Sequence, residues 1–213
     1  MLELVTLQGP NVVLAPLARE QLPLLLTAAN EDRRLYRYAD VPADAASMRA
    51  YLEAAEDERA RGCALPFVIT ARASGQVLGA TRFACIERWP WPADHPLRRA
   101  AHLPDVVEID GTWLAASAVG KGIHREASLL LLTHAFESWR VRRVAFRCDA
   151  RNEPARRAVE KLGVRFDGVL RAASIAPDGA VLDVARYSVL DMEWRAVKSA
   201  LTRGAEANVA SSG

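Results

Sequence analysis

Two glycines two residues apart, Gly120 and Gly122, separate a predicted strand from a strongly apolar predicted helix. The strand covers residues 106–114 and the helix covers residues 123–139. Glycine lets the backbone approach a ligand closely, and the first turn of a helix leaves N–H groups free to bind an anion. The pattern predicts a phosphate-binding turn, although the same spacing also occurs in strand-to-helix turns that bind nothing.

A further strand is predicted after this helix, over residues 143–148, so the strands on either side of the helix must run parallel. The neighbouring segments instead form antiparallel hairpins. The predicted hairpin strands cover residues 66–71, 77–86, 164–175 and 183–190. One or two short strands are also expected between Leu4 and Leu17, and the sheet is therefore expected to be mixed.

Helices are predicted where apolar residues recur with the spacing of a helix face. They cover residues 18–30, a segment that ends at Gly62, residues 123–139, residues 152–162 and a short stretch to about Leu201. The small residues of 203–213 are expected to form a disordered tail. Residues 1–202 are therefore predicted to form one domain.

The composition of the 213-residue chain excludes several classes of protein. A formal net charge of +2 argues against a general nucleic-acid or membrane-surface binder, which shows a concentrated basic face. No stretch is long and apolar enough to span a membrane, and the first residues do not resemble a signal peptide, so a cytoplasmic location is expected. The cysteines Cys63, Cys85 and Cys148 lie far apart, without the spacing of a metal site, and are expected to be reduced and buried.

Residues 87–104 are too rich in proline for regular structure. The segment carries Trp89 and Trp91, and two interpretations of these rings stay open. They belong to a functional loop, or they cover an edge of the core.

Two carboxylates on the strand 106–114 are the candidates for catalysis. Strict alternation places Glu108 and Asp110 on one face with Leu114, and Trp113 on the opposite face with Ile109. Two acids this close should raise each other's pKa, which favours a general base. The alternative is that they are solvated or paired with arginines of the neighbouring strand.

Several sequence segments, taken in order, resemble one family. They are EIDGTWL (108–114), VGKGIHREASLLLLTHAFE (119–137), RVAFRCDARNEPARRAVEKLGVRFDGVLR (143–171) and, from Asp178 onward, DG, YSVL and EW. Together they resemble the GNAT superfamily of acyl-CoA-dependent N-acetyltransferases, and within it the RimJ/RimL-type branch. The resemblance covers about residues 10–202 and is strongest from 106 to 194.

The resemblance implies a fold of the α/β class with a mostly antiparallel seven-stranded sheet, flanked by helices, in which one parallel pair of strands splays apart. It also implies that acyl-CoA, with acetyl-CoA as the donor, binds in that opening as co-substrate. No metal site is expected from the spacing of the cysteines. By position, the cofactor-binding residues would be Trp113 and Leu114 (pantetheine), Val119, Gly120, Lys121, Gly122, Ile123 and His124 (pyrophosphate), and Asn152 (pantetheine, from the opposite side).

The chain departs from the family pattern in the phosphate loop. Val119 replaces an Arg or Gln, and His124 replaces a common Asn or Gly. The backbone amides, Lys121 and Arg125 would still hold phosphate, and a protonated His124 would add a hydrogen bond. Asn152 is also a preferred helix N-cap, a role that needs no ligand.

The chain also departs from the family at the expected proton donors for the leaving thiolate. A Tyr common in the family is Val159 here, and a Ser of RimL-like members is Ala155. Water, Ser117 and Tyr187 stay as candidates, and their spacing does not select among them.

The main hypothesis is an N-acyltransferase in which an amine attacks the thioester directly and Glu108 or Asp110 accepts its proton. The acceptor is expected to be a protein N-terminal amine or a small-molecule amine. The alternative is a GNAT-like protein that binds acyl-CoA or a partner with little catalysis, and a third is a scaffold without ligand. A homodimer through the C-terminal strands is compatible with all three.

Overall fold

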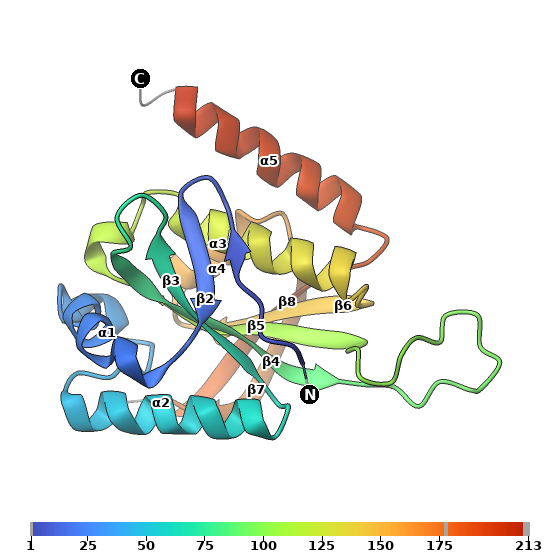
Figure 1. The fold of residues 1–213 in the computed structure, drawn as a ribbon, viewed down its shortest axis with the longest axis horizontal. Coiled ribbons are helices and arrows are strands. Elements are labelled where there is room, and N and C mark those ends of the chain that lie inside the picture. Colours follow the sequence, from blue (N-terminus) through green and yellow to red (C-terminus); the bar gives the residue numbers. More distant parts are fainter. Residues whose placement is uncertain (1, 177–178, 211–213) are drawn as a thin grey trace.

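An eight-stranded mixed sheet runs through the computed structural model, which describes residues 2–176 and 179–210 (Figure 1). The strand order is β1-β2-β3-β4-β5-β6-β8-β7. The strands are β1 (Leu7–Gln8), β2 (Val12–Pro16), β3 (Leu65–Ala71), β4 (Val77–Glu87), β5 (Val106–Leu114), β6 (Arg143–Asp149), β7 (Arg165–Ile175) and β8 (Val181–Leu190). The mixed sheet is confirmed, and it has one strand more than the seven predicted because the two-residue β1 pairs with β2.

One pair of strands, β5 and β6, is parallel, and all other neighbours are antiparallel. The parallel pairing runs from Val106 opposite Arg143 to Ile109 opposite Phe146. Beyond this point β5 continues to Leu114 and β6 to Asp149 without pairing to each other. The predicted splay between the parallel strands is therefore present.

Helices cover both faces of the sheet (Figure 1). On one face lie α1 (Leu22–Ala29) and α2 (Ala45–Ala60), whose buried residues pack with those of β3 and β4. On the other face lie α3 (Ile123–Thr133), α4 (Glu153–Glu160) and α5 (Trp194–Ala210).

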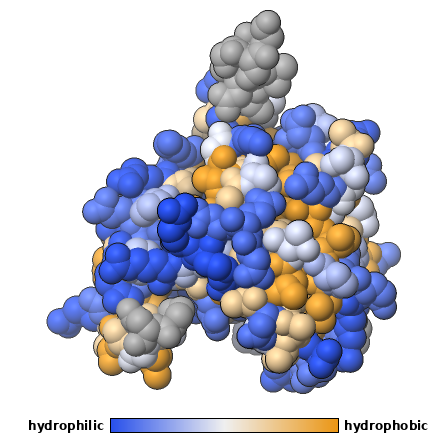
Figure 2. All heavy atoms as spheres, turned by 90° about the vertical axis from the view of Figure 1, so that its left-hand side faces the viewer, coloured by the Kyte–Doolittle hydropathy of each residue, from blue (hydrophilic) through white to orange (hydrophobic). Residues whose placement is uncertain are grey.

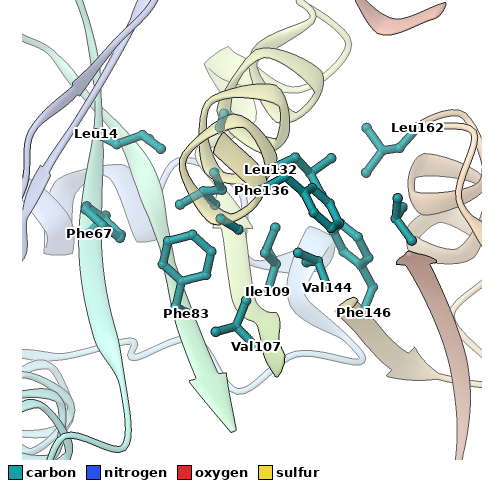
Figure 3. Packing of buried hydrophobic residues seen from close by; sticks show 14 of the residues in the cluster. Leu14, Phe67, Phe83, Val107, Ile109, Leu132, Phe136, Val144, Phe146 and Leu162 are labelled. Carbon is teal, nitrogen blue, oxygen red and sulfur yellow. The ribbon is translucent and has the colours of Figure 1, made fainter. Parts of the chain in front are cut away.

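The larger core lies between the sheet and α3, as Figure 3 shows. Leu131 and Leu132 of α3 are fully buried, and Phe83 of β4 packs against Trp139 with ring centroids 4.7 Å apart. Full burial of a leucine side chain stabilises the fold by about 1.5–3 kcal/mol. The helix α3 packs against the sheet on one side and against α5 on another, which explains why the predicted helix 123–139 is apolar on most of its circumference. Its last turn, His134–Ser138, is a wider π-type turn.

The strict alternation predicted for β5 is wrong after Asp110. Gly111 has a φ of 60° and, with Thr112, stands opposite the single residue Thr81 of β4. A glycine in this conformation forms a β-bulge, which moves the following side chains to the other face. Trp113 therefore packs among residues of α1 and α2, on the same face as the carboxylates.

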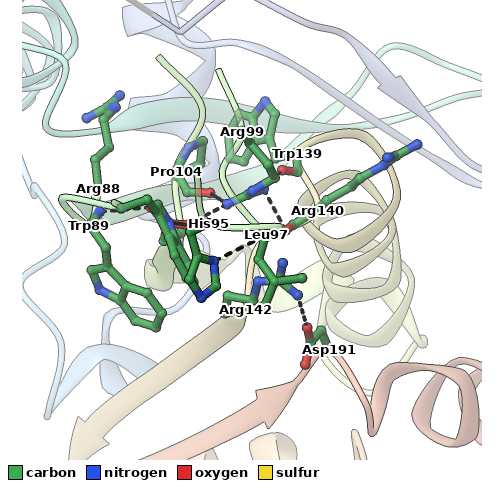
Figure 4. A network of polar contacts seen from close by, with 12 residues as sticks. Arg88, Trp89, His95, Leu97, Arg99, Pro104, Trp139, Arg140, Arg142 and Asp191 are labelled. Atoms are coloured by element: carbon green, nitrogen blue, oxygen red, sulfur yellow. Dashed lines mark hydrogen bonds and ion pairs between the residues drawn. The ribbon is translucent and has the colours of Figure 1, made fainter. Parts of the chain in front are cut away.

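The segment between β4 and β5, residues 88–105, contains no helix or strand and extends from the sheet as an arm (Figure 1). Its tryptophans do not cover the core. The rings of Trp89 and Trp91 lie 5.7 Å apart, and His95 packs 4.5 Å from Trp91. Figure 4 shows the base of the arm, where Arg99 donates hydrogen bonds to the carbonyl oxygens of Pro104, Trp139 and Arg140.

The C-terminal helix α5 continues to Ala210, beyond the end near Leu201 that the sequence predicts. The domain boundary at residue 202 and the disordered tail stay predictions, and residues 211–213 lie outside the described part of the chain. Pro177 and Asp178, between the predicted hairpin strands 164–175 and 183–190, also lie outside the described part. Cys63 and Cys85 are exposed, so the prediction of buried thiols is wrong for them. No helix in the described residues is long and apolar enough to cross a bilayer.

Candidate active site

Glu108 lies at the centre of the sheet, at the last part of β5 that still pairs with β6. Only 3% of the residue is exposed. Its Oε1 lies 3.0 Å from Nε of Arg147, and its Oε2 lies 3.5 Å from Nη2 of Arg186. Burial raises the pKa of Glu108, the positive charge of Arg147 opposes this, and the charge of Asp110 adds to the increase. The prediction of a raised pKa is confirmed, with burial as the main cause.

Asp110 is held by arginines on both neighbouring strands. Its Oδ2 accepts hydrogen bonds of 3.1 Å from Arg82 of β4 and of 3.1 Å from Arg147 of β6. Burial would raise the pKa of Asp110, but Arg147 and Arg82 together outweigh it, and the pKa is lowered. The prediction that both acids are raised is therefore wrong for Asp110. A carboxylate that stays ionised and doubly paired is a weak base, so Glu108 is the better candidate.

The structure shows the alternative in which the two acids pair with arginines of the neighbouring strands, Arg147 of β6 and Arg82 of β4. The residue that the sequence did not indicate is Arg186 of β8, which also faces Glu108. Arg147 and Arg186 stand directly opposite each other on β6 and β8, and each side chain is more than 40% exposed. Like charges directly opposite in a sheet are destabilising unless an acid lies between them, and Glu108 takes that place. Alternation along β6 places Arg147 on the same face as Ala145, the register partner of Glu108. The presence of Arg186 beside Glu108 depends on the pairing of β6 with β8, which the sequence does not indicate.

A thiol also lies beside Glu108. Sγ of Cys85 is 3.9 Å from Oε1 of Glu108. Cys85 has a φ of 46°, at an irregularity in the pairing of β4 with β5. Although Cys85 is exposed as a residue, partial desolvation of its thiol beside β5 raises the pKa and the charge of Glu108 raises it further, so the neutral thiol is favoured.

The glycine turn has the geometry that was predicted. Gly120 and Gly122 both have a φ of 77°, and Gly122 is the N-cap of α3. In the described part of the chain, the backbone N–H groups of Gly120, Gly122, Ile123 and His124 have no hydrogen-bond acceptor. A Cβ at either glycine would meet nothing within 4 Å, so the glycines are required by conformation and not by protein packing. Four free N–H groups with open space beside them fit an anion such as a pyrophosphate.

The side chains of this turn differ in what they offer an anion. Val119 and Lys121 are exposed, and Nη2 of Arg125 donates a 3.1 Å hydrogen bond to the carbonyl of Ala200 in α5. Burial lowers the pKa of His124, so the neutral imidazole is favoured and the charge-assisted hydrogen bond proposed for it is disfavoured. Figure 2 views the molecule from the side on which the chain enters α3, and hydrophilic residues cover much of that face.

The end of β5 is shaped by Tyr36, which lies in a short turn (Arg33–Tyr36) after α1. Its hydroxyl donates a 2.8 Å hydrogen bond to the carbonyl of Leu114, and its ring packs edge-on against buried Trp113. The Leu114 carbonyl is therefore already occupied. What stays open for a pantetheine arm is the edge of β5 beyond Ile109, which has no partner in β6.

Asn152 is the N-cap of α4, and its Oδ1 accepts a 3.1 Å hydrogen bond from the N–H of Ala155. The capping role considered for it is thus present. The side-chain NH₂ group has no hydrogen-bond partner among the described residues, so one polar group stays available to a ligand.

Neither side chain considered as a proton donor is free. The Tyr187 hydroxyl donates to Glu160 at 2.9 Å and accepts from Arg156 at 3.1 Å, and the ring is fully buried. Burial raises the pKa of Tyr187. The hydroxyl of Ser117 donates to Oε1 of Glu31 at 3.0 Å. Of the three candidates named from the sequence, water is the one that does not depend on a side chain already engaged in the structure. Among the described residues no cluster of three or more His, Cys, Asp or Glu side chains could hold a metal ion.

The chain is similar to acetyltransferases in sequence. A family model described as an acetyltransferase (GNAT) domain matches residues 11–165. "Putative ribosomal N-acetyltransferase YdaF" of Bacillus subtilis is 35% identical over 88 residues, which are 41% of this chain and 48% of YdaF. The match thus spans about half the length of that relative.

Solved structures extend the similarity to nearly the whole chain. A "putative acetyltransferase" from T. thermophilus is 33% identical, with 95% of this chain and 98% of that chain covered and a TM-score of 0.76. RimJ of Mycobacterium smegmatis, solved in complex with CoA-disulfide, is 21% identical, with 94% and 95% covered and a TM-score of 0.76. At 21% identity, the similarity to RimJ shows a shared fold.

Proposed function

The chain belongs to the GNAT family of acetyltransferases, and from this we propose that it transfers the acetyl group of acetyl-CoA to a primary amine. GNAT acetyltransferases use acetyl-CoA. The observation that supports the proposal is that the splayed end of β5 leads along the chain into a turn with free backbone N–H groups. Free N–H groups lie in the glycine turn, and β5 has no partner in β6 between Ile109 and its end at Leu114.

We assign the phosphate groups of the co-substrate to the backbone N–H groups of residues 120 and 122–124, and its pantetheine arm to the unpaired edge of β5. The side-chain NH₂ group of Asn152 would contact the pantetheine from the other side. Bound there, acetyl-CoA supplies an acyl group activated as a thioester. Because Val119 is apolar and His124 is favoured in its neutral form, the backbone, the helix dipole and the exposed Lys121 would provide most of the anion binding.

Glu108 is proposed as the general base. A raised pKa makes its carboxylate a better proton acceptor than Asp110, whose pKa is lowered. Glu108 would accept, directly or through one water, the proton that the attacking amine loses. Arg147 and Arg186 would hold the carboxylate in place, and water would return a proton to the departing sulfur.

The acceptor we propose is the N-terminal α-amine of a protein. The similarity to YdaF and the fold shared with RimJ support this choice and the RimJ/RimL-like branch of the family. A small-molecule amine is the second candidate.

A thermal-shift titration with acetyl-CoA and with free CoA tests the first half of the proposal. A ligand at 100 times its Kd stabilises a protein by about 2.7 kcal/mol, which corresponds to a rise in Tm of about 5–11 °C for a domain of this size. We expect a dose-dependent rise with both compounds. A flat response with both would contradict the proposed cofactor site.

Release of free CoA in the presence of a panel of peptides and small amines tests the second half. We expect turnover with at least one α-amine. Stabilisation by acetyl-CoA without turnover on any amine would instead support an acyl-CoA-binding protein, a role that the departures at Val159 and Ala155 would explain.

A further inference from the structure

A pocket of about 450 Å³ lies on the same face of the sheet as Glu108, beyond the part that α1 and α2 cover. We call it the arginine pocket. It is formed by β6, β8 and β7 and by the start of the segment that leads into α5. Its lining residues include Arg143, Arg165, Arg186, Asp167, Ser188 and Glu193.

The acids of the arginine pocket are already engaged, while two of its arginines are not. Asp167 accepts a 2.9 Å hydrogen bond from the hydroxyl of Ser188, and Glu193 accepts one of 2.9 Å from the N–H of Leu190. In the described part of the chain, Arg143 and Arg165 form no ion pair. Nε of Arg143 is buried without any hydrogen-bond partner. A buried guanidinium N–H without a partner is costly, so an anion would be favoured here.

The arginine pocket is continuous with the surroundings of Glu108. Arg186 lines the pocket and also faces the Glu108 carboxylate at 3.5 Å. Across the strands, Glu108, Ala145, Ser188 and Arg165 are successive register partners. With about 4.8 Å between strands, the backbones of Glu108 and Arg165 lie roughly 14 Å apart.

We propose that the acceptor is a peptide N-terminus that carries an acidic side chain within its first few residues, and that Arg143 and Arg165 bind this carboxylate. The inference rests on the proposed function and names the class of its acceptor. An extended chain rises about 3.3 Å per residue. Two or three residues, together with the length of the arginine side chains, would thus span from an amine at Glu108 to the pocket.

The charge of the arginine pocket favours one carboxylate over a polyanion. Three arginines and two acids line it, which leaves a single positive charge. Arginine binds carboxylates with two parallel hydrogen bonds. A nucleic-acid backbone instead requires a row of uncompensated basic groups.

Binding of dye-labelled peptides, measured by fluorescence anisotropy, tests the inference independently of turnover. The probes are Ala-Ala-Glu-Ala with a C-terminal dye, its Gln counterpart and its phosphoserine counterpart, each with saturating CoA. We expect the Glu peptide to bind at least about 10-fold more tightly than the Gln peptide, which corresponds to about 1.4 kcal/mol. Arg165→Gln should reduce this ratio to near 1. Arg195→Gln removes the same charge from an exposed position on α5, outside the pocket, and should preserve the ratio.

Each outcome decides the inference. Equal binding of the Glu and Gln peptides, or tighter binding of the phosphoserine peptide than of the Glu peptide, would overturn it. A Glu preference that Arg165→Gln leaves intact would also overturn it. A Glu preference lost in Arg165→Gln supports it, even if no peptide is acetylated, and in that case only the proposed transferase function fails. Because Arg165 is exposed, its substitution should leave folding intact, which circular dichroism checks.

Discussion

Two buried carboxylates lie three residues apart where β5 begins, and they differ in the number and burial of the donors around them. Asp105 and Glu108 are each only 3% exposed. Asp105 accepts hydrogen bonds from the N–H of Trp89, from Nε1 of Trp91 and from Nη2 of Arg99, each 2.8 Å long. Glu108 instead faces two arginines, at 3.0 and 3.5 Å, that are more than 40% exposed.

The pKa directions follow from this difference. Burial would raise the pKa of Asp105, but the hydrogen bonds from Trp89, Arg99 and Trp91 outweigh it, and the pKa is lowered. For Glu108 the arginines do not outweigh burial, and the pKa is raised. A fully hydrogen-bonded carboxylate holds the arm to the sheet, whereas an incompletely compensated one can accept a proton. Burial alone therefore does not identify a base, and the surrounding donors must be considered as well.

The largest expected effect concerns the reaction. Glu108→Gln keeps the size of the side chain and removes its basicity, so kcat for acetyl transfer should fall by about 10²–10⁴-fold. The Kd of CoA, measured by thermal shift, should change little because the glycine turn is untouched. Glu87→Gln, at an exposed position on the neighbouring strand, is the matched control. An unchanged kcat in Glu108→Gln would remove Glu108 as the base.

The next effect concerns the stability of the arm. Asp105→Asn leaves the largely buried Arg99 without its counter-charge, and the free energy of unfolding should fall by about 3 kcal/mol. Urea denaturation measures this change. Asp94→Asn lies in the same arm but is exposed, so it should have little effect. If both variants lost the same stability, the anchoring role of Asp105 would be wrong.

The two carboxylates should also have opposite effects on the pH dependence of stability. The lowered pKa of Asp105 stabilises the fold above its ordinary value of 3.8, and this contribution is lost as the pH falls through the lowered pKa. The raised pKa of Glu108 favours the fold below its ordinary value of 4.5, and that contribution is lost as the pH rises through the raised pKa. Differences in unfolding free energy between wild type and each Asn or Gln variant should therefore change with pH in opposite directions. Slopes of the same sign would contradict the pKa directions.

The strands and the glycine turn could be predicted because their signals are local. The bounds predicted for β5 match those observed, and Gly120 and Gly122 adopt the positive φ that their spacing suggested. Trp113 was placed on the wrong face because one bulge at Gly111 reverses the alternation. A glycine inside a strand is a signal for such a bulge, and it was available in the sequence.

The residues that surround Asp105 and Glu108 could not be predicted from local signals. Arg186 reaches Glu108 because β8 pairs with β6, although β7 lies between them in the chain. Asp105 follows a proline-rich segment in which no periodicity indicates what folds back onto it. Charged networks of this kind depend on contacts between distant residues, which neither propensity nor spacing contains.

The smallest expected effect is a shift in the pH profile of kcat, and it tests directly whether the charges around Glu108 set its pKa. Asp110→Asn should lower the pKa of Glu108, because it removes a nearby negative charge and leaves Arg147 to interact with Glu108 alone. If Glu108 is the base, the acidic limb of the pH profile of kcat should move to lower pH in this variant. Asp149→Asn, on β6 but paired with Arg151, should leave the limb in place. A limb that does not move in Asp110→Asn, or that moves to higher pH, would mean that another group controls the rate.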